Sequence, residues 1–199
     1  MTTMHKVLNI LAKTICVLLH PMLMPCYGMA LFFLSNQPTI ALLPKVYCMV
    51  SMVGTFVLTL VIPFVLMLFL WRKGYIDSLH IEQAQQRTTP YIYTLICYGF
   101  WTYFLHSTIH MPSFIVWIAV GAIVALLAVA LINHWWKISA HLTGIGGLLG
   151  GICSFSLCYS TLPIWLIISL LILSLLLMYA RLYLKAHTPM QVVCGYLLG

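Results

Sequence analysis

The chain consists mainly of long apolar runs separated by short polar segments, and this pattern constrains its fold more than any other feature. Several runs exceed about 18 residues, the length at which an apolar segment indicates a membrane-spanning helix. Of the 199 residues, 63% are hydrophobic and only 6% are charged, which is far from the usage of soluble domains. We therefore expect an all-α, polytopic transmembrane bundle of about six spans. A single membrane-embedded domain should cover residues 1–199.

The expected helices follow from the runs and from the residues that interrupt them. Residues 4–20 carry Lys6 and Lys13, which indicates an interfacial helix or the lower part of a first span that breaks at His20-Pro21. The other runs predict spans over residues 22–36, 45–71, 91–108, 113–133, 142–159 and 162–180, and a last helix from Thr188. That last helix is too short for a bilayer core of ~30 Å. Either the sequence is truncated or this helix stays shallow.

Three polar segments, residues 72–90, 134–141 and 181–191, carry most of the side chains that can do chemistry. Two predicted spans separate the first segment from the second, and two more separate the second from the third. Because an even number of spans returns the chain to the same side of a membrane, we expect the three segments to meet there. His106 and His110 fall on the opposite side by the same count, and we assign them no role.

The third segment combines a cation, a histidine and the start of a helix. Arg181 ends an apolar run, and His187 directly precedes Thr188, Pro189 and Gln191. These last three residues predict a capped helix in which Thr188 and Gln191 form a capping box. His187 should therefore lie at the positive end of a helix, close to Arg181. Helix amides, a guanidinium and an imidazole together suit a phosphate, and an imidazole can also act as a nucleophile.

Arg181-x5-His187-x3 resembles the third signature of the type-2 phosphatidic acid phosphatase superfamily, which includes lipid phosphatases and vanadium haloperoxidases. That signature reads Ser-Arg-x5-His-x3-Asp. Ala180 stands here for Ser and Gln191 for Asp, while the spacing is intact. The phrase HTPMQVVCGYLLG is similar to members of this superfamily from the Bacteroidetes, so the chain looks like a degenerate member of that type.

The other two segments resemble the remaining signatures in the expected order. In the second segment, Ser139 and His141 match a Pro-Ser-Gly-His signature, and Ser139 is also a suitable N-cap for the following helix. In the first segment, Arg87 matches Lys-x6-Arg-Pro, with His80 in place of Lys and the proline later, at Pro90. The spacing of His80 and Arg87 fits one face of a short helix that Asp77 or Ser78 would cap.

The resemblance implies an integral membrane phosphatase that hydrolyses a lipid phosphate monoester or pyrophosphate through a phosphohistidine intermediate. It implies that His187 attacks phosphorus, that His141 protonates the leaving oxygen and then activates water, and that Gln191 orients the nucleophile. The residues implied to bind phosphate are Arg181, Arg87, His80 and Ser139. No metal or other cofactor is implied. The implied partners are the lipid phosphate and the surrounding membrane lipids.

Each segment also has a plainer interpretation, and other functions stay open. Arg181 and His187 suit a membrane interface, residues 77–90 suit a solvated connector, and Trp135 and Trp136 suit an aromatic belt. The histidines His5, His20 and His134 fit interfacial positions. A degenerate relative that binds a lipid phosphate without hydrolysing it is one alternative function, and a small transporter is another. Nucleic-acid binding is excluded because the cations are scattered through the loops.

Charge bears on the orientation of the chain in its membrane. The net charge of +7 comes from nine Lys and Arg residues against two acids, Asp77 and Glu82. Most loop cations lie on the side of the three polar segments, and only Lys45 lies on the other, so the positive-inside rule places the site in the cytoplasm. The superfamily's site usually faces the periplasm, and several of these cations would be functional. We therefore expect a bacterial inner-membrane protein with a periplasmic site.

Overall fold

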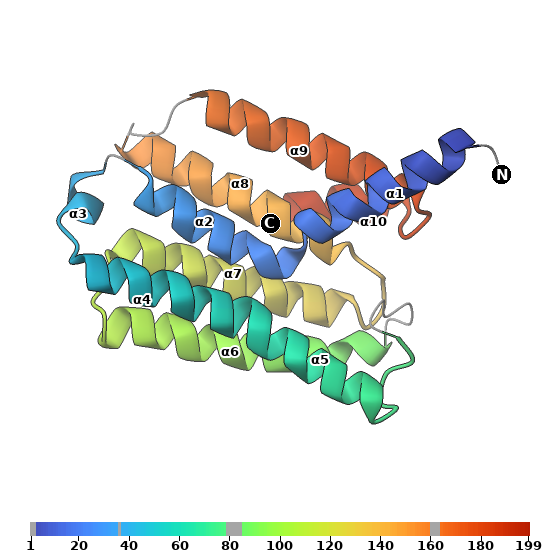
Figure 1. The fold of residues 1–199 in the computed structure, drawn as a ribbon, viewed down its shortest axis with the longest axis horizontal. Helices are drawn as coiled ribbons and strands as arrows, with labels where there is room; N and C mark the ends of the chain where they lie inside the picture. The colour runs from blue at the N-terminus through green and yellow to red at the C-terminus, as the bar shows by residue number, and fades with distance from the viewer. Residues whose placement is uncertain (1–2, 36, 79–84, 160–163) are drawn as a thin grey trace.

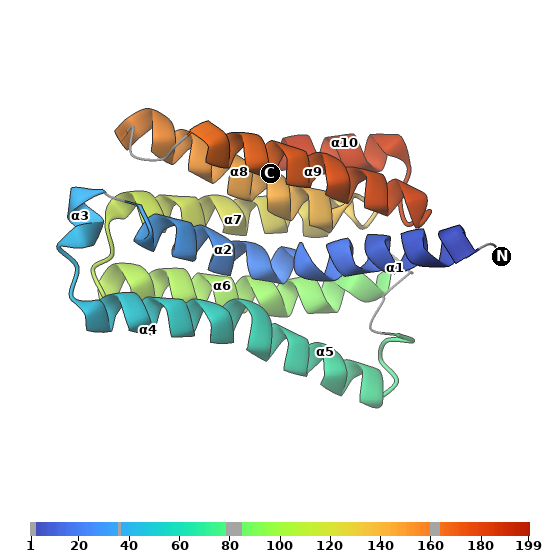
Figure 2. The ribbon, with the colours of Figure 1, turned by 45° about the horizontal axis from the view of Figure 1, so that its top comes forward.

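The structure is a computed structural model that describes residues 3–35, 37–78, 85–159 and 164–199. Within these ranges every regular element is a helix, which confirms the expected all-α fold class. Figure 2 shows α8, α9 and α10 on one side of the bundle and α4, α5 and α6 on the opposite side, with α2 and α7 between them. The helices of the second half are α6 (Thr88–Ser107), α7 (Ser113–Ile132), α8 (Ala140–Tyr159), α9 (Ile164–Tyr183) and α10 (Pro189–Leu198).

The first apolar run is broken where its prolines predict a break. Helix α1 (Thr3–Leu18) ends before a single 3-10 turn at Pro21–Leu23, and α2 (Met24–Phe33) follows. Nδ1 of His20 accepts a hydrogen bond from the Met22 amide at 3.4 Å and so caps this turn. Helix α1 packs against α9, and its N-terminal part extends beyond the end of the bundle (Figure 1).

The second run is a continuous but irregular helix. A short helix α3 (Pro38–Ala41) precedes α4 (Lys45–Phe56), and one π-helical turn at Val57–Val61 connects α4 to α5 (Ile62–Arg72). The wide turn ends at Val61, two residues before Pro63, which has no amide hydrogen to continue the α-helical ladder.

Among the described residues, five helical segments are long and apolar enough to cross a membrane: Met4–Phe33, Lys45–Arg72, Ser113–Ile132, Ala140–Tyr159 and Ile164–Tyr183. The sequence predicted about six spans, including one over residues 91–108. Helix α6 occupies that position and has the same length as α7, but its many Thr and Tyr residues make it less apolar. It packs along α7 as a member of the bundle.

Glycines hold α10 tightly against α8. A Cβ at Gly146 would overlap the carbonyl oxygen of Tyr196, and one at Gly195 would lie 2.7 Å from the carbonyl oxygen of Ser139. Only glycine permits such a close approach of two helix backbones. As a result, the start of α10 lies beside the start of α8.

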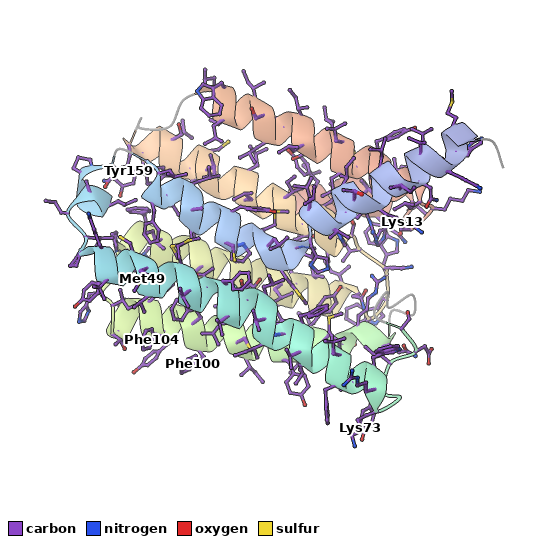
Figure 3. The ribbon with its side chains drawn as sticks, viewed as in Figure 1. Lys13, Met49, Lys73, Phe100, Phe104 and Tyr159 are labelled. Atoms are coloured by element: carbon purple, nitrogen blue, oxygen red, sulfur yellow. The ribbon has the colours of Figure 1, made fainter. Side chains whose placement is uncertain are left out.

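The polar segments gather at one end of the bundle, as the span count predicts. Helix α5 ends there at Arg72, α6 begins at Thr88, and the turn from α9 to α10 lies at the same end (Figure 1). Figure 3 places Lys13 and Lys73 toward this end and Tyr159 at the opposite end. The described residues of the three segments can therefore share one site.

Candidate functional site

Two local signals at the end of α9 and the start of α10 position His187. Lys185 adopts a left-handed conformation (φ 51°), and the amide of Ala186 bonds back to the Arg181 carbonyl at 3.1 Å, so the chain reverses directly after α9. The amide of Gln191 then donates to Thr188 Oγ1 at 3.5 Å, while the amide of Thr188 donates to Gln191 Oε1 at 3.1 Å. The predicted capping box is confirmed, and it holds His187 one residue before the cap.

Two oxygen atoms fix the proton on the His187 ring. Nδ1 lies 3.1 Å from the carbonyl oxygen of Lys137 and 3.2 Å from Gln191 Oε1. The Thr188 amide donates to the same side-chain oxygen, so that atom acts as an acceptor toward His187. With acceptors around Nδ1, the hydrogen lies on Nδ1, and Nε2 keeps its lone pair.

The His187 ring is neutral near pH 7. Only 8% of the residue is exposed, and burial lowers its pKa to about 4, with the charge of Arg181 as the second cause. The charge of Arg87 lowers the pKa further, while the hydrogen bonds to Gln191 and Lys137 oppose the shift. An unprotonated Nε2 within electrostatic range of two guanidinium groups is suited to attack on an anionic centre.

Arg181 and Arg87 lie within electrostatic range of His187 and belong to different helices. Arg181 lies in the last turn of α9, and its Nη1 donates to Cys16 Sγ at 3.8 Å. Arg87 occupies the N-cap position of α6, within hydrogen-bonding range of the Tyr91 hydroxyl. The structure thus brings together both arginines that the sequence selected, through helices that are far apart in the chain.

Ser139 takes the predicted N-cap position at the start of α8, but its hydroxyl does not cap the helix. Its backbone carbonyl accepts the Thr143 amide at 3.0 Å, and its amide donates to the Gln191 carbonyl at 3.3 Å. Ser139 is fully buried, and neither its Oγ nor the buried Nε of Arg181 has a hydrogen-bond partner among the residues that the structure describes. An unpaired buried donor costs about 1–3 kcal/mol, so each of these two donors favours a bound acceptor.

His141 has partners that the sequence did not indicate. Its Nε2 lies 3.2 Å from the carbonyl oxygen of Cys16, in the last turn of α1, and its ring meets the His20 ring edge-on with centroids 5.1 Å apart. Arg181 and His187 also lie within electrostatic range of His141. The sequence alone places His20 at the membrane interface and gives it no role. The sequence feature that points to its contact with His141 is the break at Pro21, which lets the chain turn inward beside α8.

The first polar segment differs from the prediction where it is described. Asp77 lies in a bend, and Gln86 Nε2 donates to its carboxylate at 2.8 Å. The short helix that Asp77 or Ser78 was predicted to cap falls mainly outside the described residues. Residues Gln85–Arg87 form one 3-10 turn that continues into α6, so Arg87 lies at the start of α6. His80 and Glu82 lie outside the described residues. The described part of the chain contains no group of three His, Cys, Asp or Glu that could hold a metal ion.

A comparison of the chain with protein-family models, curated proteins and solved structures finds no match. The site contains a neutral, oriented histidine, two arginines, a buried serine hydroxyl and a second histidine, all at one end of a membrane bundle.

Proposed function

We propose that the protein is a metal-independent phosphatase of the membrane that hydrolyses a lipid phosphate monoester or pyrophosphate, with His187 as the nucleophile. The observation that carries this proposal is the pair of acceptors at Nδ1 of His187, at 3.1 Å and 3.2 Å, which leaves Nε2 unprotonated. A bacterial inner membrane with the site on the periplasmic side belongs to the same proposal.

In the first step, Nε2 of His187 attacks phosphorus, a P–N bond forms, and the bond from phosphorus to the leaving oxygen breaks. Arg181, Arg87 and the Ser139 hydroxyl hold the non-bridging oxygens, because stabilisation of charge on the transferring phosphoryl group is usually the largest catalytic contribution. The leaving oxygen takes a proton from His141, which enters this step as an imidazolium ion and leaves it as a neutral imidazole. That proton lies on Nε2, which donates to the Cys16 carbonyl, so His141 has to release this carbonyl during turnover.

In the second step, His141 takes a proton from water, and the water oxygen attacks phosphorus. The P–N bond breaks, inorganic phosphate leaves, and His187 regains its lone pair at Nε2. The protein returns to its starting protonation state without any other reactant. Gln191 keeps the hydrogen on Nδ1 of His187 in both steps.

A second function, binding of a lipid phosphate without hydrolysis, is favoured by two observations. Because His141 Nε2 donates to the Cys16 carbonyl, the proton donor is occupied by α1. The neutral side chain of Gln191 also supplies no negative charge to the imidazolium that forms during turnover. Under this alternative the site binds the same ligand and releases no phosphate.

The test is phosphate release by the purified protein from phosphatidates, prenyl pyrophosphates and lipid A phosphates. Under the proposal, release survives EDTA, is inhibited by vanadate as a five-coordinate mimic of phosphorus, and is lost in His187→Ala. His106→Ala is the matched control because His106 lies in the last turn of α6, at the far end of the bundle. Activity that disappears with EDTA and returns with magnesium would contradict this mechanism.

A further inference from the structure

A cavity of about 670 Å³ lies inside the bundle between α2, α6, α7 and α8. Its walls are largely apolar, and Phe32, Leu105 and Ile115 line it toward the end of the bundle that is remote from His187. Small residues of α7 and α8, such as Gly121, also line it, so these helices leave space between them. The phosphate chemistry proposed above does not use this cavity.

The cavity begins next to the candidate phosphate site. Tyr91 lines the cavity, and its hydroxyl is within hydrogen-bonding range of Arg87. Ala140 lines it too and stands between Ser139 and His141 in the chain. A molecule with its phosphate on Arg87 and Arg181 would therefore have its remaining part at the mouth of this cavity.

The cavity is as long as a lipid chain. The lining residues Tyr91 and Leu105 are about 14 positions apart on α6, which is about 21 Å at the helical rise of about 1.5 Å per residue. On the antiparallel α7, Ile115 and Val129 line the cavity over the same length. One leaflet of a bilayer core is about 15 Å thick, so the cavity accommodates an extended hydrocarbon chain rather than a small head group.

The hydroxyl groups in the cavity walls bond largely to backbone carbonyls and to other side chains in the walls. Trp101 Nε1 donates to Thr55 Oγ1 at 2.9 Å, and Thr59 Oγ1 donates to the Thr55 carbonyl at 2.8 Å. Tyr98 lies within hydrogen-bonding range of Thr59. The bonds of Trp101 and Tyr98 connect α6 to α4 and to the π-helical turn. Because much of the hydrogen-bonding capacity is used in this way, the cavity presents mainly carbon to an occupant.

The cavity also reaches the outer surface of α7. Val124 lines it and is 60% exposed, and Gly121 beside it is exposed as well. In a helix with the length and apolarity of a membrane span, this surface faces lipid. A chain can therefore enter from the membrane beside α7 without leaving the apolar phase.

We infer that this cavity binds the hydrocarbon chain of the lipid whose phosphate lies at Arg87 and Arg181, and that it makes the protein selective for long-chain phosphates. The inference rests on the proposed function for the position of the phosphate. It adds the substrate class: a lipid phosphate with a chain that extends along α6 to about the depth of Leu105. Water-soluble phosphates with short chains leave most of the cavity empty and are poor ligands.

Two glycines provide a matched pair of variants. A Cβ at Gly121 or at Gly99 meets no atom within 4 Å, so each position has space for a larger side chain. Gly121 lines the cavity, whereas Gly99 lies on α6 and does not line it. Gly121→Phe should weaken the binding of a long-chain alkyl phosphate about tenfold, as expected when a packed site is overfilled. The same variant should leave the binding of a butyl phosphate unchanged, and Gly99→Phe should leave the binding of both ligands unchanged.

Binding is measured separately from hydrolysis through Trp101, which lines the cavity and is 6% exposed. A variant that keeps Trp101 as its only tryptophan is titrated with a long-chain alkyl phosphate brominated along the chain. Bromine quenches tryptophan on contact, so we expect saturable quenching. The corresponding brominated alcohol should reach half-maximal quenching at an about tenfold higher concentration, because it lacks the phosphate that anchors the chain.

The outcomes separate this inference from the proposed function. Phosphate-dependent quenching without phosphate release supports the chain site and contradicts the phosphatase. A second outcome is that the protein releases phosphate, that the alkyl phosphate and the alcohol quench equally, and that Gly121→Phe and Gly99→Phe bind alike. This outcome contradicts the chain site and leaves the proposed phosphatase activity in place. Loss of long-chain binding in both glycine variants would show a general effect on the bundle, and that result also contradicts the inference.

Discussion

Oε1 of Gln191 lies 3.2 Å from Nδ1 of His187 and 3.1 Å from the amide nitrogen of Thr188. One oxygen atom therefore closes the capping box of α10 and orients the histidine. The sequence predicts these two roles of Gln191 separately, the capping box from Thr188 and the orientation of His187 from the family resemblance. In the structure one side chain has both roles, because His187 directly precedes Thr188, the cap residue.

The joint role predicts that Gln191→Leu abolishes phosphate release and also destabilises the protein by about 0.5–2 kcal/mol, the usual cost of a lost cap. Thr188→Ala is the control, because it removes a capping hydroxyl and leaves the bond from Gln191 to His187 in place. It should cost similar stability and retain most activity. Thermal unfolding and phosphate release are measured on both variants. An active Gln191→Leu protein would end the catalytic claim for this residue.

The pH dependence of turnover should reflect the lowered pKa of His187. Attack requires the neutral ring, so the pKa of His187 sets the acid limb of the activity profile, and activity is lost as the pH falls through about 4. An ordinary histidine would lose activity near pH 6.5 already. Gln191→Asp places a carboxylate beside Nδ1, which raises the pKa of His187, so the acid limb of kcat/KM should move upward while the rate at neutral pH is kept or raised. A limb that stays in place in Gln191→Asp would contradict this account.

Arg181→Lys should reduce phosphate release at least tenfold, the equivalent of one charged hydrogen bond of about 1.5–3 kcal/mol. Lysine keeps the positive charge but has no Nε and no planar pair of donors for two phosphate oxygens. The buried, unpaired Nε of Arg181 is the donor that the change removes. Arg72→Lys, in the last turn of α5, serves as the control for the substitution itself. Equal activities of the two variants would show that Arg181 acts by charge alone.

His141 has two roles in this account, and two substitutions separate them. His141→Ala should lose turnover and also loosen α1, because it removes the partner of the Cys16 carbonyl. His141→Gln can still donate to this carbonyl through its amide but cannot transfer a proton, so it should keep α1 in place without turnover. Hydrogen exchange of the α1 amides reports the docking, and phosphate release reports the chemistry. Turnover by His141→Gln would exclude His141 as the proton donor.

Lys185→Gly should stabilise the protein by about 1 kcal/mol, since a left-handed residue other than glycine carries a cost of about that size. Lys185 has a φ of 51° at the turn that follows α9. Lys185→Ala removes the same charge but keeps the strain, so it should bring no gain in thermal stability. A gain of equal size in Lys185→Ala would assign the effect to charge.

The parts of this molecule that depend on local chemistry were predictable from the sequence. The capping box at Thr188, the break at Pro21 and the meeting of Arg181 with Arg87 at one end follow from neighbouring residues or from counting spans. The contact of His141 with Cys16 joins residues 125 positions apart, and no periodicity encodes it. The Ser139 hydroxyl failed as a predicted cap because the tight packing of α10 on α8 decides its surroundings.

The central claim is a covalent phosphohistidine at His187. The direct measurement is rapid acid-free quenching of the protein during turnover of a radiolabelled lipid phosphate, followed by mapping of the labelled peptide. We expect label on His187 that is stable to base and labile to acid, and no label in His187→Ala. Label on another residue, or phosphate release by His187→Ala at a rate near that of the unaltered protein, would contradict the account.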